Sequence, residues 1–425
     1  MSKPIIGIVG LGYVGLPLAC LFATKYKVIG YDIKEERINE LKNGVDTTLE
    51  VDGKLLFEVV VEGLNDEQGL FLTSSFSELK RCNYYIVAVP TCVDEKNNPV
   101  LNSLLEASKV LGKCLKKEDI VIYESTVYPG ATEEVCVPIL ERSSNLKYNR
   151  DFYVGYSPER VSPGVKTRIL ENILKITSGS TKETASKIDN LYRSVLKKGT
   201  QLVSSIKVAE AAKIVENCQR DINIAFVNEM AKIFNLMNID THEVLEAAET
   251  KWNFLPFKPG LVGGYCIGTD PYYLTQKAKQ YGYYPEVILS GRRLNDGMGV
   301  YVASEVIKLL IDKEINIKKA NALILGFTFK ENCPDVRNTK VIDIYKRLRV
   351  FGLNTDVYDP IANKAYVKSH YEVDLIQQPL DNKYDVIVLA VSHNNFRLLE
   401  IEKLKRKGGV VYDVKNFLAH KDRTL

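Results

Sequence analysis

The residues best suited to chemistry lie in a glycine-rich stretch at 263–271, which reads Gly-Gly-Tyr-Cys-Ile-Gly-Thr-Asp-Pro. Cys266 follows two glycines, whose missing side chains let a substrate approach the sulfur closely. Its thiol has a reference pKa of about 8.5, so a cation or a helix dipole is needed to make it a thiolate at neutral pH. For an isolated cysteine, a packed thiol in a structural turn is the more frequent alternative.

A second pair of reactive side chains, Lys213 and Asn217, is four residues apart in a segment of helical periodicity, with Glu210 one turn earlier. Residues at this spacing share one face of a helix. A charged donor beside an amide donor is the combination that stabilises an oxyanion. The alternative is an ordinary solvated helix face, and only proximity to Cys266 would favour catalysis.

A dinucleotide site is indicated by Gly10-Leu11-Gly12-Tyr13-Val14-Gly15, which fits Gly-x-Gly-x-x-Gly between an apolar run and a helix-length segment. The three glycines permit a tight turn, close approach of the pyrophosphate and packing of the helix on the strand. Asp32 follows about 20 residues on, where a carboxylate accepts the ribose hydroxyls and repels a 2′-phosphate. The pattern predicts NAD, whereas the nearby Lys34 and Arg37 would suit NADP.

Two short segments after apolar runs, 89–91 with Pro90 and Thr91 and 125–127 with Ser125 and Thr126, are further candidates for the cofactor pocket. Open parallel sheets bind ligands at the carboxyl ends of their strands. Each segment taken alone is more often a plain loop.

The elements that position these residues follow a doubly wound pattern at both ends of the chain. Runs that are apolar on both faces indicate parallel strands covered by helices. In the first domain, 1–200, the expected strands are 5–9, 27–31, 84–89, 120–123, 152–156 and 173–177, and the expected helices are 16–26 and 101–115. In the last domain, 313–425, they are strands 322–326, 356–358, 385–391 and 409–413 and helices 340–351 and 398–405.

A long helix is predicted from about residue 207 to Asn238, within a central domain at 201–312 that also carries a loop at 254–271. The predicted fold class is therefore α/β, with two doubly wound Rossmann-like domains joined by a long central helix. Because the last domain has no glycine fingerprint, we expect it to bind something other than a dinucleotide.

Composition excludes several classes of function. The chain has 425 residues, 57 basic and 53 acidic, with no long run of either charge, so it carries no signature of nucleic-acid or membrane binding. No apolar stretch suits a membrane span or a secretory signal, and we expect a soluble, cytoplasmic protein. The eight cysteines include no Cys-x-x-Cys pair and the four histidines fall in no motif, so no metal site is expected.

Together these motifs resemble the UDP-glucose/GDP-mannose dehydrogenase family over essentially the whole chain. The matching segments are 7–15, 124–127, 156–160, 209–217, 263–270 and 329–337. The segments 254–260, 266–268 and 270–274 look more like the branch that acts on UDP-N-acetylhexosamines than the UDP-glucose branch.

The resemblance implies a four-electron oxidation of a sugar C6 alcohol to the carboxylate, with two NAD per sugar. Cys266 would capture the intermediate aldehyde as a thiohemiacetal, which a second oxidation turns into a thioester. Lys213 and Asn217 would stabilise the oxyanions, and Asp270 would orient or deprotonate the hydrolytic water. Glu159 and Thr126 would hold a catalytic water.

Binding residues are likewise implied by position. The cofactor set is Gly10, Gly12, Tyr13, Val14, Gly15, Asp32, Arg37, Pro90, Thr91, Ser125, Thr126 and Arg337. The substrate set is Glu159, Arg160, Lys213, Asn217, Phe254, Leu255, Phe257, Lys258, Gly260, Arg293, Phe329 and Lys330. The family also implies a homodimer through the central helix and a role in supplying precursors for a surface polysaccharide.

Two departures and several alternatives stay open. Tyr265 replaces a histidine found in many members, and Pro163 stands where the UDP-glucose branch has a second glutamate. The expected substrate is UDP-GlcNAc or UDP-GalNAc, but the sequence does not say which epimer is preferred, and UDP-ManNAc and UDP-glucose remain alternatives. A two-electron hydroxyacid dehydrogenase and a catalytically silent nucleotide-sugar or NAD-binding regulator are further alternatives, against which the reactive cysteine loop argues.

Overall fold

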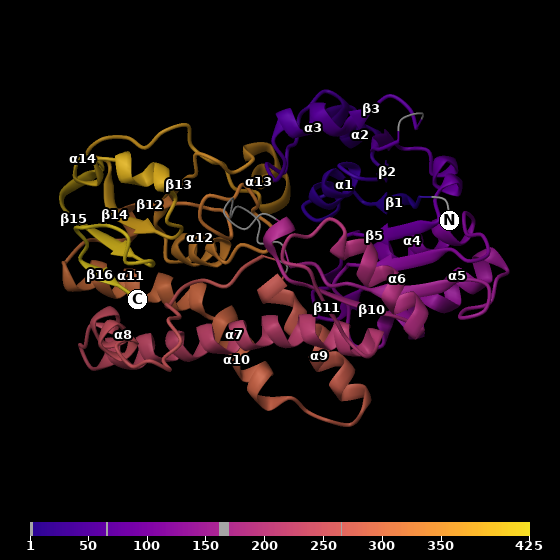
Figure 1. The fold of residues 1–425 in the computed structure, drawn as a ribbon. Helices are drawn as coiled ribbons and strands as arrows, with labels where there is room; N and C mark the ends of the chain where they lie inside the picture. The colour runs from indigo at the N-terminus through magenta and orange to yellow at the C-terminus, as the bar shows by residue number, and fades with distance from the viewer. Residues whose placement is uncertain (1–2, 65–66, 161–169, 265) are drawn as a thin grey trace. The chain divides into compact units, whose positions relative to one another are not determined.

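The computed structural model describes residues 3–64, 67–160, 170–264 and 266–425, and the chain divides into two compact units (Figure 1). The first unit comprises residues 1–216 and 272–282, and the second comprises 217–271 and 283–425. Each unit has its own sheet, and the two are described separately below.

The first unit is built on a sheet with strand order β11-β10-β9-β8-β5-β1-β2-β4-β3 among the described residues. Neighbouring strands are parallel, except that β9 and β10 are antiparallel. The strands are β1 (Ile5–Val9), β2 (Lys27–Tyr31), β3 (Val60–Val61), β4 (Gly69–Thr73), β5 (Tyr84–Val87), β8 (Ile120–Tyr123), β9 (Tyr153–Tyr156), β10 (Lys175–Gly179) and β11 (Thr200–Leu202). A separate ribbon pairs β6 (Cys92–Val93) with β7 (Pro99–Val100).

Helices cover both faces of this sheet, as the apolar strands predicted. Along one strand, Ile8 packs into one core and Val9 into the other. Apolar side chains of α1, α2, α3 and α6 fill the first core, and those of α4 and α5 fill the second. The helices are α1 (Gly15–Ala23), α2 (Glu35–Lys42), α3 (Gly53–Val59), α4 (Asn102–Gly112), α5 (Val137–Ser144) and α6 (Lys182–Arg193).

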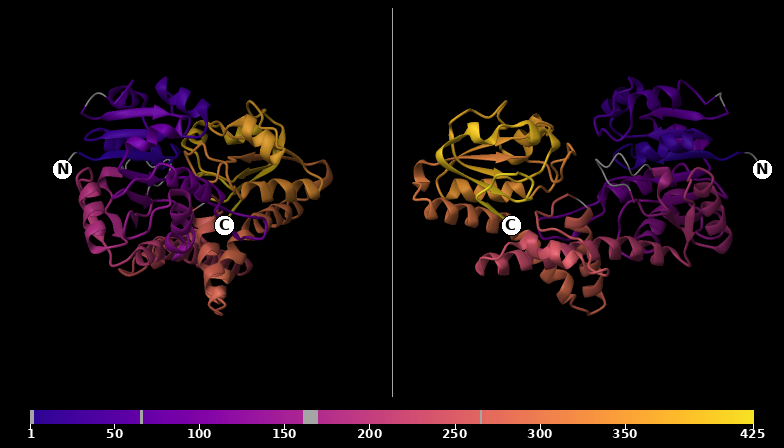
Figure 2. Two further views of the ribbon diagram at one scale, coloured as in Figure 1. Left: turned by 90° about the vertical axis from the view of Figure 1, so that its right-hand side faces the viewer. Right: turned by 60° about the vertical axis from the view of Figure 1, so that its left-hand side comes forward.

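The second unit contains an all-parallel sheet of order β13-β12-β14-β15-β16 among its described residues. Its strands are β12 (Asn321–Leu325), β13 (Asn354–Tyr358), β14 (Tyr384–Leu389), β15 (Lys405–Asp413) and β16 (Arg423–Thr424). Alternate strand residues again enter two cores, and helices α11 (Met298–Asp312), α12 (Val341–Val350) and α13 (Lys364–Tyr371) contribute side chains to the larger one. Figure 2 shows the ribbon of this sheet and its helices, coloured orange to yellow, from two further directions. The prediction of a mixed α/β fold with two sheets is confirmed.

The predicted long helix is α7 (Ile206–Leu236), a helix of 31 residues. It is followed by α8 (Thr241–Glu249), which the Asp240 side chain caps by accepting hydrogen bonds from the first backbone N–H groups. Helix α9 (Cys266–Gln280) and helix α10 (Glu286–Asp296) complete the central region.

Two local predictions are wrong, and one predicted strand runs antiparallel to its neighbour. The loop expected over 254–271 ends earlier, because α9 begins at Cys266 and contains Pro271, whose missing N–H removes only one helical hydrogen bond. The helix expected over 398–405 is reduced to α14 (Ile401–Leu404), and β15 starts at Lys405. Strand β10 runs antiparallel to β9, and no described residue between them belongs to an α-helix that could carry a parallel crossover.

A buried polar network joins strands of the first unit. The Lys175 ammonium lies 2.7 Å from the Glu124 carboxylate, and both side chains are almost fully buried. Lys175 also donates to the carbonyl oxygen of Pro158 at 2.9 Å, and the Tyr192 hydroxyl donates to the other carboxylate oxygen of Glu124. Burial raises the pKa of Glu124, while Lys175 and Tyr192 favour its charged form. The network therefore fixes the segment that precedes Glu159.

We predict that Lys175→Met destabilises the protein by about 3–5 kcal/mol, because it leaves the buried Glu124 without its counter-ion. The free energy of unfolding, measured by urea denaturation, is the readout. Lys197→Met is the matched control, since Lys197 pairs with Glu171 at the surface and such pairs contribute at most about 1 kcal/mol. Equal losses in the two variants would contradict the prediction.

Candidate active site

The turn between β1 and α1 has the backbone that a dinucleotide site needs. Gly10 has a φ of +92°, which disfavours other residues, and a Cβ on Gly15 would lie 1.8 Å from the carbonyl oxygen of Gly10. At Gly12 a Cβ would meet no atom within 4 Å, so a ligand can approach the backbone there. Tyr13 and Val14 complete the turn and are half-buried. The residues present fit the pyrophosphate of NAD.

Two charged side chains, Asp32 directly after β2 and Arg37 on α2, lie beside the glycine turn, where the ribose is expected. Asp32 accepts hydrogen bonds from the backbone N–H of Leu11 at 2.9 Å and of Lys34 at 3.0 Å. Arg37 donates to the Asp46 carboxylate at 2.7 Å and to the Leu11 carbonyl oxygen at 3.0 Å. Burial alone would raise the pKa of Asp46, but Arg37 and further hydrogen bonds hold it below its usual value. The charge of Arg37 is thus neutralised, which suits NAD better than NADP.

The other predicted cofactor residues lie after the neighbouring strands β5 and β8. Thr91 donates through its hydroxyl to the carbonyl oxygen of Thr126 at 2.9 Å, and Ser125 donates to that of Val89 at 2.6 Å. Pro90 is exposed beside them. These hydrogen bonds join the two segments at the carboxyl edge of the sheet, the position that the sequence predicts for them.

Lys213 and Glu159 form a buried pair within the first unit. The Lys213 ammonium donates to the Glu159 carbonyl oxygen at 2.9 Å and lies 3.3 Å from its carboxylate. Lys213 is 5% exposed and Glu159 is 7% exposed. The second carboxylate oxygen of Glu159 has no partner among the described residues, and a buried carboxylate oxygen of this kind suits a bound water. The adjacent Arg160 pairs with Glu216 at 3.3 Å.

Glu210, one turn before Lys213 on α7, fixes the segment that follows Thr126. Its carboxylate accepts hydrogen bonds from the backbone N–H of Gly130 at 2.5 Å and of Thr132 at 2.9 Å. Burial raises the pKa of Glu210 to about 7, although these donors oppose the shift. The alternative of a solvated helix face is wrong here, because Glu210 and Lys213 are both buried.

In the second unit, the reactive segment is arranged around the start of α9. Cys266 is the first residue of this helix and is half-buried, and Gly264 has a φ of +75° in the turn before it. A thiol at a helix N-terminus has its thiolate favoured by the helix dipole. Asp270, one turn further, accepts a hydrogen bond from the Asn217 amide at 2.5 Å, and both are buried. Of the predicted catalytic residues here, Asn217 and Asp270 are brought together.

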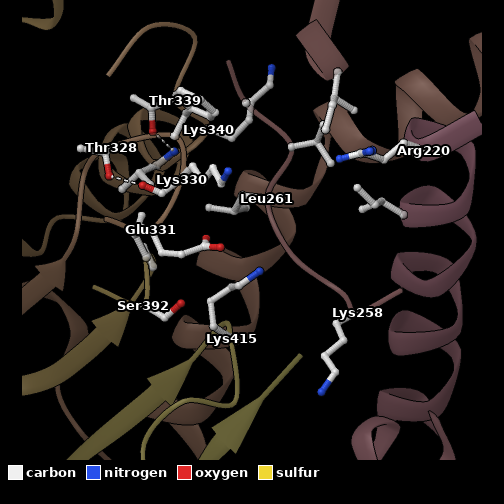
Figure 3. Close-up of a pocket in the computed structure, with 18 of the residues that line it drawn as sticks. Arg220, Lys258, Leu261, Thr328, Lys330, Glu331, Thr339, Lys340, Ser392 and Lys415 are labelled. Carbon is white, nitrogen blue, oxygen red and sulfur yellow. Dashed lines mark hydrogen bonds between the residues drawn. The ribbon is translucent and has the colours of Figure 1, made fainter. Parts of the chain in front are cut away.

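A cavity of about 490 Å³ lies within the second unit, between the 256–263 segment, α7 and the carboxyl edge of the β12–β15 sheet (Figure 3). Its charged lining residues are Arg220, Lys258, Lys330, Glu331, Lys340 and Lys415, five cations and one anion. Figure 3 shows Lys415 and Glu331 on the same side of the cavity as Lys330. An excess of cations in a concave site suits a diphosphate.

The predicted substrate residues of this unit fall into three groups. Those that line the cavity are Phe257, Lys258, Phe329 and Lys330. Phe254, Leu255 and Gly260 are near these residues in the sequence but do not line the cavity. The side-chain amide of Asn228 donates a hydrogen bond to the carbonyl oxygen of Gly260 and accepts one from its backbone N–H. Arg293 instead lines a separate groove between α7 and α10.

Arg337, predicted to contact the cofactor, is bound to Asp335 by several hydrogen bonds within this unit. The departures at Tyr265 and Pro163 lie outside the described residues.

Several lining residues were missed by the sequence reasoning. Ser392 and Lys415 follow β14 and β15, and the rule that ligands bind at the carboxyl ends of parallel strands could have found them. Arg220 and Lys340 lie on or beside helices that reach the cavity from elsewhere in the chain, and no local signal marks them. Lys340 also pairs with Asp296 at 2.9 Å.

The described residues contain neither a candidate metal site nor a helix that could span a membrane. No three histidine, cysteine or carboxylate side chains are grouped in a way that could hold a metal ion. No helix there has both the length and the apolar character that a membrane crossing demands.

Comparison with known families matches three successive regions of the chain. Residues 5–196 match the NAD binding domain, residues 207–297 the central domain, and residues 323–420 the UDP binding domain of the UDP-glucose/GDP-mannose dehydrogenase family. The NAD binding match contains the glycine turn and Asp32, and the UDP binding match contains Lys330, Lys340 and Lys415 of the cavity.

Individual relatives are similar to this chain over nearly its full length. The chain is 52% identical to the UDP-N-acetyl-D-glucosamine 6-dehydrogenase of Pseudomonas aeruginosa over 416 residues, which cover 97% of each chain. It is 51% identical to Protein CapL of Staphylococcus aureus, and this match covers 97% of this chain and 96% of that protein. The solved structure of UDP-D-ManNAc dehydrogenase from Pyrococcus horikoshii superposes with a TM-score of 0.88 at 30% identity, covering 99% of this chain and 98% of that one. The chain belongs to the UDP-glucose/GDP-mannose dehydrogenase family and is an NAD-dependent UDP-sugar dehydrogenase.

Proposed function

We propose that this protein oxidises the C6 alcohol of UDP-N-acetyl-D-glucosamine to the carboxylate, using two NAD and one water per sugar. The observation that carries this proposal is the 52% identity, over 97% of both chains, with a UDP-N-acetyl-D-glucosamine 6-dehydrogenase. A UDP-N-acetyl-D-mannosamine dehydrogenase is only 32% identical over a similar length, which makes that epimer the weaker candidate.

The cavity of the second unit holds the nucleotide part of the substrate in this proposal. Lys330 and Lys415 neutralise the diphosphate, and Phe257 and Phe329 supply apolar surface for the rest of the nucleotide. Cations confined to a concave site bind a diphosphate more strongly than the same cations spread over the surface.

The oxidation requires a nucleophile that can add to a carbonyl and later leave. NAD bound at the glycine turn supplies the hydride acceptor for both oxidations. The Cys266 thiolate adds to the C6 aldehyde and forms a thiohemiacetal; loss of a second hydride leaves a thioester, and water displaces the thiolate to give the acid. The N-terminus of α9 favours the thiolate form of Cys266.

Buried polar groups assist these steps. The positive charge of Lys213 stabilises the oxyanions that form at C6, and the side-chain amide of Asn217 donates a hydrogen bond to them. The unpartnered carboxylate oxygen of Glu159 binds a catalytic water together with Thr126, and Asp270 orients or deprotonates the hydrolytic water. Lys213 is positioned for its role by Glu159, and Asn217 by Asp270.

The wider biological role and organisation follow the family. We assign three domains, at 1–200, 201–312 and 313–425, and place the enzyme in the cytoplasm as a supplier of precursor for a surface polysaccharide. We also propose a homodimer that buries one face of α7, because Val215, Phe226 and Ile233 on this helix are exposed apolar side chains.

The first prediction from the proposed function concerns the number of NADH formed per sugar. The wild-type enzyme should form two NADH per UDP-N-acetylglucosamine consumed, measured by absorbance at a limiting amount of the sugar. In Cys266→Ser, kcat should fall by at least about 10³-fold, the scale of loss when a covalent nucleophile is removed. Cys92→Ser is the matched control, because Cys92 is also half-buried but has no role in the reaction.

One NADH per sugar would instead identify a two-electron dehydrogenase. A Cys266→Ser enzyme that turns over at the wild-type rate would exclude the thioester.

The second prediction concerns the sugar. When UDP-GlcNAc, UDP-GalNAc, UDP-ManNAc and UDP-glucose are assayed side by side, kcat/KM should be highest for UDP-GlcNAc. A site built to hydrogen-bond particular hydroxyl or amide groups discriminates strongly against analogues that leave those groups unpaired. A higher kcat/KM for UDP-ManNAc or UDP-glucose would refute the assignment while leaving the family unchanged.

The third prediction concerns assembly. Light scattering at low protein concentration should give the mass of a dimer, and Phe226→Glu should shift it to that of a monomer, because a charge placed in an apolar interface is costly to bury. Val300→Glu, at an exposed apolar position on α11, is the control. A wild-type monomer would disprove the dimer.

A further inference from the structure

A buried histidine holds the segment that carries Lys330 into the nucleotide cavity. His393 follows β14 and is fully buried. Its Nδ1 atom lies 2.9 Å from the backbone N–H of Asn332, and its Nε2 atom lies 3.0 Å from the Asp359 carboxylate and 3.1 Å from the Thr328 hydroxyl. One imidazole ring thus contacts both ends of residues 328–332, and the first four residues of this segment line the cavity.

These contacts fix which ring nitrogen carries the hydrogen. A backbone N–H can only donate, so Nδ1 accepts from Asn332 and must be unprotonated. The Thr328 hydroxyl donates to the Lys330 carbonyl oxygen at 2.9 Å, which leaves its lone pairs to accept from Nε2–H. The carboxylate of Asp359 accepts as well. His393 is therefore a neutral imidazole with its hydrogen on Nε2.

Asp359 anchors this arrangement to the sheet. It is fully buried and accepts hydrogen bonds from the backbone N–H groups of Phe327 at 2.7 Å and Ile361 at 2.9 Å. Burial alone would raise the pKa of Asp359, but His393 and these donors hold it below its usual value. The imidazole consequently has a fixed, charged partner on one side and the Lys330 segment on the other.

The same segment touches the turn in front of Cys266. A Cβ built on Gly264 would lie 2.8 Å from the Phe329 ring, and one built on Gly263 would lie 3.0 Å from the Phe329 Cβ. Phe329 therefore packs directly against the two glycines. Any shift of residues 328–332 would move both a cavity cation and the surface on which the Cys266 turn rests.

We propose that His393 is a positioning residue for the UDP-sugar: its neutral imidazole sets residues 328–332 so that Lys330 faces the diphosphate and Phe329 supports the turn before Cys266. This inference rests on the proposed function, since it takes the cavity as the nucleotide site. No short motif contains His393, and it acts through the segment without touching the substrate.

Two amide variants distinguish the hydrogen bond made by Nδ1 from the one made by Nε2. In His393→Gln, the side-chain amide reaches the Nε2 position and keeps a donor for Asp359, but the acceptor for the Asn332 N–H is lost. In His393→Asn, the side-chain oxygen takes the Nδ1 position and keeps that acceptor. His420→Gln is the control, because His420 is exposed and outside the site.

The test is calorimetric titration of the full-length protein with UDP, together with KM for the UDP-sugar and for NAD. We expect His393→Gln to weaken UDP binding and raise KM for the UDP-sugar about tenfold, the usual effect of leaving a buried donor unpaired, with KM for NAD unchanged. His393→Asn should restore most of the affinity, and the control should match the wild type. Circular dichroism verifies that each variant is folded.

Equal UDP affinity in His393→Gln and the wild type would overturn the inference, as would an equal loss in both amide variants, which would indicate a purely structural histidine. A wild-type protein that does not bind UDP would instead overturn the assignment of the cavity, and the positioning role with it. The two failures are distinguishable because only the second appears in the unmodified enzyme.

Discussion

A charged group that leaves water must find a partner of opposite charge, and this constraint determines where most of the functional side chains lie. Lys213 is held by Glu159, and the segment that contains Glu159 is held in turn by Lys175 and Glu124. Each charge in this series fixes the next. The Lys213 ammonium group therefore has a defined position on α7.

Both units also use the edge at which parallel strands end. In the first unit, this edge carries the glycine turn after β1 and Asp32 after β2. In the second, it carries Ser392 after β14 and Lys415 after β15. The same geometry offers two sites of different chemistry, because one has a glycine backbone open to a pyrophosphate and the other has the cations to which we assign the diphosphate of the substrate.

The sequence predicted the elements and residues that have local signals. Strands such as Ile5–Val9 and the helix α7 follow from apolar periodicity, and the glycine turn with Asp32 follows from spacing. The start of α9 was missed because glycine and proline suggest a loop, whereas helix formation there depends on tertiary packing. No local signal marks His393, because the residues on which its proposed role depends, Asn332 and Asp359, lie more than 30 residues away and meet it only in the fold.

The link between Arg37 and Asp46 also makes cofactor choice a property of several residues at once. Arg37 holds the Leu11 carbonyl as well as Asp46, so its guanidinium is already used in shaping the turn that receives the pyrophosphate. A change at Asp32 alone would take away the repulsion of a 2′-phosphate without supplying any cation to attract one. Converting this enzyme to NADP would require rebuilding the scaffold of the turn, so drift from one coenzyme to the other is not a single-step event.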